Sequence, residues 1–197
     1  MTEAIRILKD EHRSISAVLL GLKHLAQLAQ DPHVQPRFQV FRSMLRYIDE
    51  YPERLHHPKE DEHLFARLLQ RAPETKALVD DLKEEHVKGV QLVRDLERSL
   101  LFFEEGWPRG AREFLAAVDA YADFHWNHMR KEEAELLPLA ERYLDAEDWR
   151  AIGAAFAHNR DALSGVEAQD FQKLFSRIAN LAPAPIGLGD AWQKAAS

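Results

Sequence analysis

The sequence predicts an all-α protein, namely an up-down-up-down four-helix bundle with extra C-terminal helices. Apolar residues recur at spacings of three and four along nearly the whole chain, which is typical of helices. Sustained alternation of β-branched residues, the pattern of strands, is absent. Four long helical stretches are joined by short segments containing proline or glycine, which favours antiparallel neighbours. We expect the bundle over residues 1–145, and a C-terminal helical extension and tail, packed on the bundle, over residues 146–197.

The helix boundaries follow from the ends of the apolar seams and from two helix-breaking segments, "DPHVQP" (31–36) and "EEGWPRG" (104–110). Long helices are expected at about residues 3–30, 37–71, 74–104 and 109–144, and shorter ones near 146–158 and 167–180. Pro52 and Pro58 fall inside the second helix, where each removes a backbone hydrogen bond and predicts a kink or a short break. The inward-facing seam of the fourth helix is expected to contain Phe114, Val118, Tyr121, His125, His128, Glu132, Leu136 and Leu139.

Composition excludes several classes of function. The 197-residue chain has a net charge of −7 with both signs mixed, so it lacks the clustered basic surface of nucleic-acid-binding proteins. No apolar run approaches the roughly 18 residues of a membrane span. The N-terminal segment lacks the basic-then-apolar order of a secretory signal, and we expect a cytoplasmic protein. Because cysteine is absent, any metal must be held by imidazoles and carboxylates, which suits iron, zinc, manganese or copper.

The chain contains ten histidines, and their spacing reveals an internal repeat. "LKDEHRS" (8–14) matches "LKEEHVK" (82–88) at an offset of 74 residues, and "HHPKEDEHLF" (56–65) matches "HMRKEEAELL" (128–137) at an offset of 72. Each half is therefore a helical hairpin that supplies one histidine from its first helix and a His-x-x-x-Glu pair from its second. The six residues defined in this way are His12, His56, Glu60, His86, His128 and Glu132.

These residues can form a dinuclear metal site. Residues i and i+4 lie on the same face of a helix, so the two members of each His-x-x-x-Glu pair project together. Two hairpins related by a pseudo-twofold axis would bring four imidazoles and two carboxylates to one level, and a carboxylate can bridge two cations about 3.5–4 Å apart. A single seam histidine is more often an ordinary core residue, and a charged run is more often a solvated surface. Four seam histidines in two matched halves, with buried carboxylates that need compensation, favour the metal site.

On these blocks the sequence resembles the hemerythrin-like family, which contains the HHE cation-binding domain, over about residues 4–145. The matching motifs are His12, His56-x-x-x-Glu60, His86 and His128-x-x-x-Glu132. The resemblance implies a four-helix bundle that holds a non-haem di-iron centre, with two iron ions that are oxo- or hydroxo-bridged when oxidised. It also implies a small ligand such as oxygen.

One position departs from the oxygen-carrying members of that family. Those members place a second histidine four residues before the third-helix ligand, but that position is Leu82 here. One iron would therefore have lost a ligand or replaced it. His57 is the first candidate replacement, although its repeat counterpart is Met129, and a surface or outer role is the alternative. His125 is interpreted as a core or outer neighbour, with a ligand role as its alternative.

Several other polar residues surround these motifs in the sequence. His63 lies about 10 Å along the helix axis from His56, too far to bind the same metals. A ferritin-like site is rejected because its Glu-x-x-His motif begins at Glu53 and Glu60 in the second helix but does not occur in the fourth. Four acidic residues are candidates to accept the outer N–H groups of metal-bound imidazoles, namely Glu11, Asp61, Glu85 and Glu133.

Three functions remain open from the sequence. The first is a di-iron protein that binds or senses oxygen, peroxide or nitric oxide, or that senses iron or redox state. The second is a di-iron oxidase or peroxide-decomposing enzyme, in which Tyr47, Tyr51 or Tyr121 could move protons or electrons. The third is a metal-free helical interaction module with buried histidines. A homo-oligomer is compatible with each of them.

Overall fold

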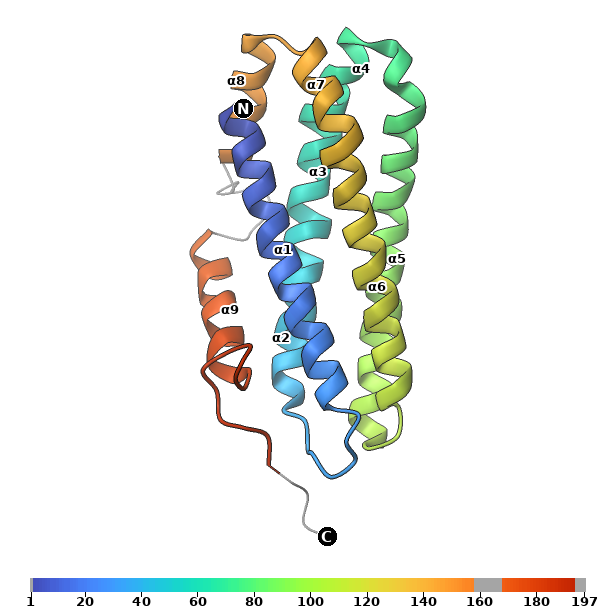
Figure 1. Ribbon diagram of the computed structural model, residues 1–197, viewed down its shortest axis with the longest axis vertical. Coiled ribbons are helices and arrows are strands. Elements are labelled where there is room, and N and C mark those ends of the chain that lie inside the picture. The colour runs from blue at the N-terminus through green and yellow to red at the C-terminus, as the bar shows by residue number, and fades with distance from the viewer. Residues whose placement is uncertain (1, 158–167, 194–197) are drawn as a thin grey trace.

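A computed structural model describes residues 2–157 and 168–193, and within these ranges the chain is helical and contains no strand. Four long helical elements run side by side as an up-down-up-down bundle, which confirms the predicted fold class (Figure 1). The first element is α1, Glu3–Leu28, and the Thr2 hydroxyl caps it by accepting a hydrogen bond from the Ile5 N–H at 3.3 Å. Among the described residues, no helix is both long and apolar enough to cross a membrane.

The second element is unbroken but alternates between α-helix and the wider π-helix. Its successive segments are α2 (Phe38–Ile48), η1 (Asp49–His56), α3 (His57–Lys59), η2 (Glu60–Phe65) and α4 (Ala66–Arg71), of which η1 and η2 are π-helical. Pro52 lies inside η1, and Pro58 lies just before η2. The His57 N–H donates to the Pro52 carbonyl, five residues back rather than four. The prediction was a kink or a short break, and the element does not break: π-helical turns occur at the prolines, where the altered hydrogen bonding accommodates their missing N–H groups.

The third and fourth elements are joined by a tight turn that requires a glycine. A 3₁₀ turn, η3 (Pro73–Thr75), leads into α5 (Lys76–Gly106), and the fourth element begins with α6 (Ala111–Lys131). Between them Gly110 has φ +88°, and a Cβ there would lie 2.9 Å from the Phe103 Cα. Only glycine adopts this backbone conformation without strain and leaves room for α5 to pack so closely.

The fourth element also contains a π-helical segment, which shifts its apolar seam. It continues from α6 through η4 (Glu132–Leu136) to α7 (Leu137–Tyr143). Seven of the eight predicted seam residues are buried, but Leu139 is only half-buried and Ala140 is fully buried in its place. The Leu137 N–H donates to the Glu132 carbonyl, five residues back. This π-helical turn contains one extra residue, so the inward-facing position moves forward by one.

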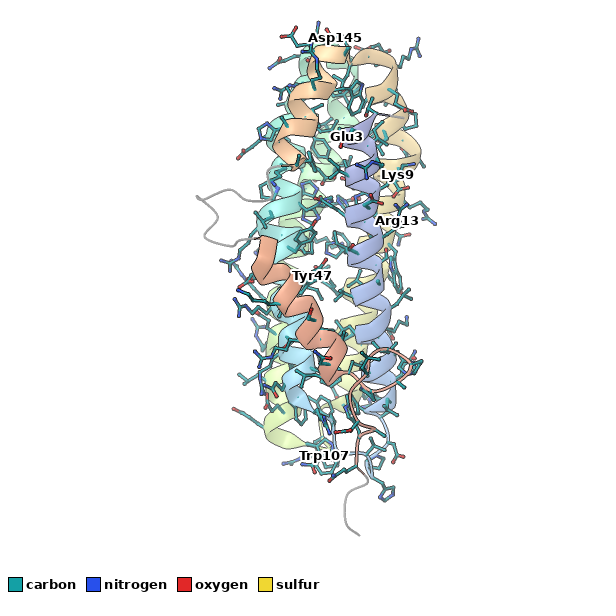
Figure 2. All side chains as sticks on the ribbon, turned by 90° about the vertical axis from the view of Figure 1, so that its left-hand side faces the viewer. Glu3, Lys9, Arg13, Tyr47, Trp107 and Asp145 are labelled. Carbon is teal, nitrogen blue, oxygen red and sulfur yellow. The ribbon has the colours of Figure 1, made fainter. Side chains whose placement is uncertain are left out.

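Two further helices cover one face of the bundle. Helix α8 (Ala146–Ala157) packs on α1, and α9 (Ala168–Leu181) packs on α2. Figure 2 views this face directly and shows both helices lying across it. In the tail, the Trp192 ring lies 5.7 Å from the Phe41 ring. The predicted ends of these helices at residues 158 and 167 fall outside the described residues.

A polar layer divides the apolar core into two clusters. One cluster includes Ile5, Leu8, Leu64 and Leu82, and the other includes Ile15, Leu19, Val93 and Val118. His12 is buried on α1 between Leu8 and Ile15, and so belongs to the layer between the clusters. The two apolar clusters therefore hold this layer at a fixed level of the bundle and shield it from water on both sides.

We expect α8 to be part of the cooperative folding unit, and Phe156 tests this. Its side chain is 1% exposed and packs within the cluster that also contains Leu8 and Leu64. Phe156→Ala should lower the free energy of unfolding by about 3–5 kcal/mol in a single urea transition, because it leaves a cavity. The matched control is Phe102→Ala, at a position that is 59% exposed, where a change within about 0.5 kcal/mol is expected. Equal effects of the two substitutions would contradict this view of α8.

Candidate metal centre

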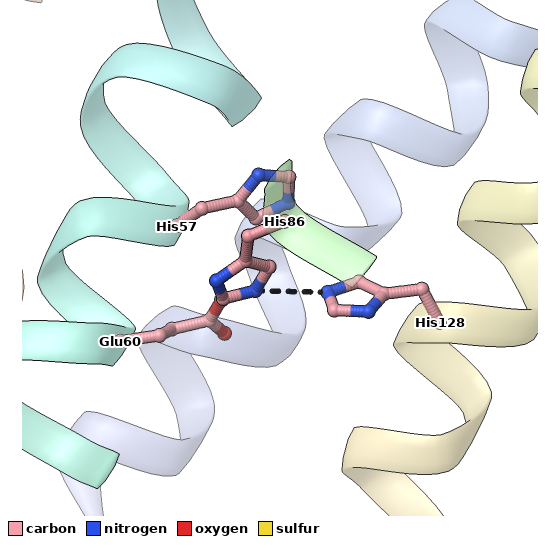
Figure 3. Close-up of side chains that lie close together, drawn as sticks. All are labelled: His57, Glu60, His86 and His128. Atoms are coloured by element: carbon pink, nitrogen blue, oxygen red, sulfur yellow. Dashed lines mark hydrogen bonds and ion pairs between the residues drawn. The ribbon is translucent and has the colours of Figure 1, made fainter. Parts of the chain in front are cut away.

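The polar layer contains all seven residues that the sequence predicted as metal ligands. Their donor atoms form two sets, and within each set the atoms lie within 4.8 Å of one another. The first set is His12, His56, Glu60 and Glu132, and the second set is His57, Glu60, His86 and His128. All seven side chains are buried, with Glu60 at 0% exposure and Glu132 at 1%. Figure 3 shows the second set, which converges from α3, η2, α5 and α6.

Both carboxylates point one oxygen toward each set. Glu60 Oε1 lies 3.3 Å from His56 Nε2, while its Oε2 lies 3.5 Å from His86 Nε2. Glu132 Oε2 lies 3.3 Å from His12 Nε2, and its Oε1 lies 3.4 Å from His128 Nε2. This is the arrangement of two carboxylates that bridge a pair of cations.

Most of the inward-facing polar atoms have no hydrogen-bond partner. Six of them are buried and unsatisfied among the described residues, namely His12 Nε2, His56 Nε2 and both carboxylate oxygens of Glu60 and of Glu132. An unpartnered buried polar group destabilises a fold by about 1–3 kcal/mol, and more when it is charged. Ligands at about 2.1 Å from a common cation lie at most about 4.2 Å apart, and the distances of 3.3–3.5 Å between the carboxylate oxygens and the imidazole Nε2 atoms fall within this range. The donor set therefore fits a pair of cations.

The rings of His86 and His128 face each other through their Nε2 atoms (Figure 3). The Nδ1 atom of His86 lies 3.2 Å from Asp61 Oδ1, and that of His128 lies 2.8 Å from Glu85 Oε2. Because a carboxylate only accepts, each ring carries its proton on Nδ1 and presents a lone pair at Nε2. These two Nε2 atoms are 3.2 Å apart. Two lone pairs at this distance repel unless a proton or a metal ion lies between them.

The predicted outer acceptors are all in place, and they link the four helical elements in a closed circuit. Glu11 on α1 accepts from His56 Nδ1 at 2.7 Å, and Asp61 in η2 accepts from His86. Glu85 on α5 accepts from His128, and Glu133 in η4 accepts from His12 Nδ1 at 2.9 Å. Each acid thus orients an imidazole of the next element. Such hydrogen bonds fix the tautomer of a ligand histidine and increase its basicity.

The buried carboxylates attract positive charge to the layer. Burial alone lowers the pKa of His86, but Asp61 and Glu132 outweigh it and raise this pKa to about 10. The pKa values of His12 and His128 are also raised by neighbouring carboxylates in spite of burial. Burial raises the pKa of Glu132, but His128 and His12 lower it well below its usual range. Protons supply this charge in the metal-free protein, and cations would replace them.

Sequence reasoning did not assign a role to Glu53, which lies behind His57. Its Oε2 accepts from His57 Nδ1 at 3.3 Å, and its Oε1 accepts from the Tyr121 hydroxyl at 2.9 Å. His125 Nε2 lies 3.2 Å from the same Oε1, so His125 is a neighbour of this carboxylate and is absent from both donor sets. Burial raises the pKa of Glu53, but the neighbouring imidazoles of His125 and His57 lower it well below its usual range. The signal in the sequence was the spacing: Glu53 lies four residues before His57 and 72 before His125.

The remaining candidates from the sequence belong to neither donor set. His63 is half-buried and belongs to neither set. Tyr47 and Tyr51 stack on each other with ring centroids 5.4 Å apart, while the Tyr121 hydroxyl donates to Glu53. Leu82 is fully buried in the apolar core.

A surface groove reaches the first donor set between α1 and α6. Its volume is about 660 Å³, and its lining includes His12, Arg13, Leu20, Trp126 and Met129. The second donor set has three imidazoles where the first has two. The repeat places Met129, which is 6% exposed, at the position equivalent to the third imidazole, His57.

An all-α bundle with two overlapping histidine–carboxylate sets in its core defines a metal-binding helical protein. A sequence profile described as "Hemerythrin HHE cation binding domain" matches residues 3–140. The chain belongs to this family, as the resemblance predicted. A search of curated proteins found no match.

The outer acceptors should control metal affinity, and Glu85 offers a clean test. Glu85→Gln weakens the acceptor of His128 Nδ1, and it should lower the affinity for one cation about 10- to 100-fold. Titration of the metal-free protein with Co²⁺ measures this affinity. The control Glu84→Gln removes the same charge at the neighbouring exposed position and should leave the affinity nearly unchanged. If the two variants bind Co²⁺ with equal affinity, the loss comes from the removal of a negative charge and not from the hydrogen bond to His128.

Proposed function

We propose that the chain is a non-haem di-iron protein that binds or senses oxygen or a related small ligand such as peroxide or nitric oxide. The observation that supports this proposal is the pair of overlapping donor sets, which share Glu60 and contain unequal numbers of imidazoles. In this proposal two sites lie side by side, and one of them has fewer protein ligands than the other.

His12 and His56 would hold the first cation, and His57, His86 and His128 would hold the second. Glu60 and Glu132 would bridge the two cations, because each carboxylate faces both donor sets. An iron pair bound by these residues supplies reversible two-electron chemistry and a coordination position for a small ligand.

The surrounding residues orient the donors and restrict the access of water. The outer carboxylates keep a proton on each Nδ1, so that Nε2 remains available as a donor. The apolar residues Ile15, Leu64 and Leu82, each at most 2% exposed, close the core above and below the layer. The groove between α1 and α6 reaches His12, and Met129 lines it where the second half has His57. We infer that a small ligand approaches the first cation through this groove.

Anaerobic purification followed by metal quantitation and optical spectroscopy tests the function. About two iron ions per chain are expected from the two donor sets, and the spectrum of the ferrous protein should change on exposure to oxygen or nitric oxide. Glu60→Ala should abolish this change, because it removes the carboxylate that both sets share. A ferrous protein that responds to neither ligand would contradict the proposal. Steady turnover of hydrogen peroxide, lost in Glu60→Ala, would support the enzyme alternative instead.

Removal of the metal should destabilise the fold. A cation present at about 1,000 times its dissociation constant stabilises the folded state by about 4 kcal/mol, provided the unfolded chain does not bind it. Treatment with a chelator should therefore lower the midpoint of thermal unfolding, and the addition of metal should restore it. Leu82→Ala serves as a comparison, because its destabilisation should persist whether metal is present or absent. An unfolding midpoint that is independent of chelator would favour the metal-free interaction module.

A further inference from the structure

A buried carboxylate that belongs to neither donor set lies against His57. Glu53 is on η1, and its side chain is 2% exposed. Its two oxygens have different partners: Oε2 accepts from His57 Nδ1, while Oε1 accepts from the Tyr121 hydroxyl. His125 Nε2 lies 3.2 Å from Oε1. Glu53 is therefore fixed from the fourth helical element at one oxygen and bound to His57 at the other.

The third helical element leaves room for this carboxylate at Gly89. A Cβ on Gly89 would lie 3.1 Å from both oxygens of Glu53, which is closer than ordinary van der Waals contact. The repeat position equivalent to Gly89 in the first half is Ile15, and the position equivalent to Glu53 in the second half is His125. A carboxylate facing a glycine thus occurs between η1 and α5, whereas the equivalent positions, His125 and Ile15, have neither a carboxylate nor a glycine.

The ring of His57 also stacks on two other imidazoles. It stacks on His86 with centroids 4.3 Å apart and an interplanar angle of 11°, and on His125 at 5.6 Å and 2°. The hydrogen bond to Glu53 then fixes the rotation of the ring within this stack. With Nδ1 donating to Glu53, Nε2 is left as the lone-pair donor.

We propose that Glu53 is a positioning residue that makes His57 the third imidazole of the second cation site, and that it thereby makes the two cation sites unequal. This assignment rests on the proposed metal centre. His57, held by Glu53, stands in for the ligand that the oxygen-carrying relatives are expected to take from the position of Leu82. The fifth imidazole then has an outer carboxylate of its own, as the other four do.

The test is a Co²⁺ titration of the metal-free full-length chain, followed by its visible absorption, which reports coordination geometry. Glu53→Gln should weaken one of the two binding steps about 10- to 100-fold and leave the other within about threefold. His57→Ala should weaken the same step. The double variant Glu53→Gln/His57→Ala should bind no more weakly than His57→Ala alone, because Glu53 acts only through that ring.

A matched pair on the other site provides the control. Glu11 accepts from His56 in the first donor set, so it acts on a different site from His57. In the double variant Glu11→Gln/His57→Ala, the fold-loss of Co²⁺ affinity should therefore equal the product of the two single losses within about threefold. If Glu53→Gln weakens both steps equally, or multiplies the loss caused by His57→Ala, the positioning role is overturned. If the wild-type chain binds no Co²⁺, the metal centre itself is overturned, and the assignment of Glu53 with it.

A second variant tests the same role without removing any polar group. Gly89→Ala crowds the Glu53 oxygens while favouring the helix, so folding should be retained. It should weaken the same Co²⁺ step as Glu53→Gln and change the Co²⁺ spectrum. The control Gly153→Ala, where the nearest atom to a new Cβ is 3.8 Å away, should do neither. A Gly89→Ala chain with wild-type affinity and spectrum at both steps would overturn the assignment.

Discussion

The burial of two carboxylates at the centre of an apolar bundle is the constraint on which the rest of this structure depends. Glu60 and Glu132 are almost completely removed from water, and none of their four oxygens accepts a hydrogen bond from a described residue. Isolated buried charges of this kind are strongly unfavourable unless opposite charge lies beside them. Protonated imidazoles supply part of this charge, and the Nε2 atoms of His86 and His128, 3.2 Å apart, need a proton or a metal ion between them. A pair of cations would satisfy the carboxylates and the imidazole lone pairs together.

This constraint also explains how the four helical elements are held in register. Each outer acceptor lies next to a central ligand position in sequence, but it hydrogen-bonds an imidazole from the following element. A shift of one helix along its axis would break two of these hydrogen bonds, the one in which its imidazole donates and the one in which its carboxylate accepts. The π-helical segments lie at this level, with His56 at the end of η1 and Glu60 and Glu132 at the starts of η2 and η4. Such segments often occur at functional sites, where they adjust the direction of side chains beyond what a regular α-helix allows.

The parts of the site that could be predicted from sequence are those that depend on spacing within a helix or on the repeat. The i, i+4 pairs and the two matched halves define the central residues without knowledge of which helices touch. The spacing of Glu53 from His57 indicates that the two can meet, but its role also depends on the space at Gly89 and on Tyr121, which lie on other elements and could not be predicted. The inward position of Ala140 instead of Leu139 was missed because a regular periodicity of 3.6 residues does not include a π-helical turn.

The differences between the two halves account for the asymmetry of the centre. A strict repeat would place equal donor sets on either side of the bridging carboxylates, yet His57 has Met129 as its counterpart and Gly89 has Ile15. The first difference adds an imidazole to one donor set and leaves a thioether beside a groove at the other. The second makes the space that Glu53 occupies behind the added imidazole. Leu82 alone suggested a missing ligand, but His57 lies where it can supply one from the second helical element. The proposed centre therefore has three imidazoles at one site and two at the other, and the site with two faces the groove.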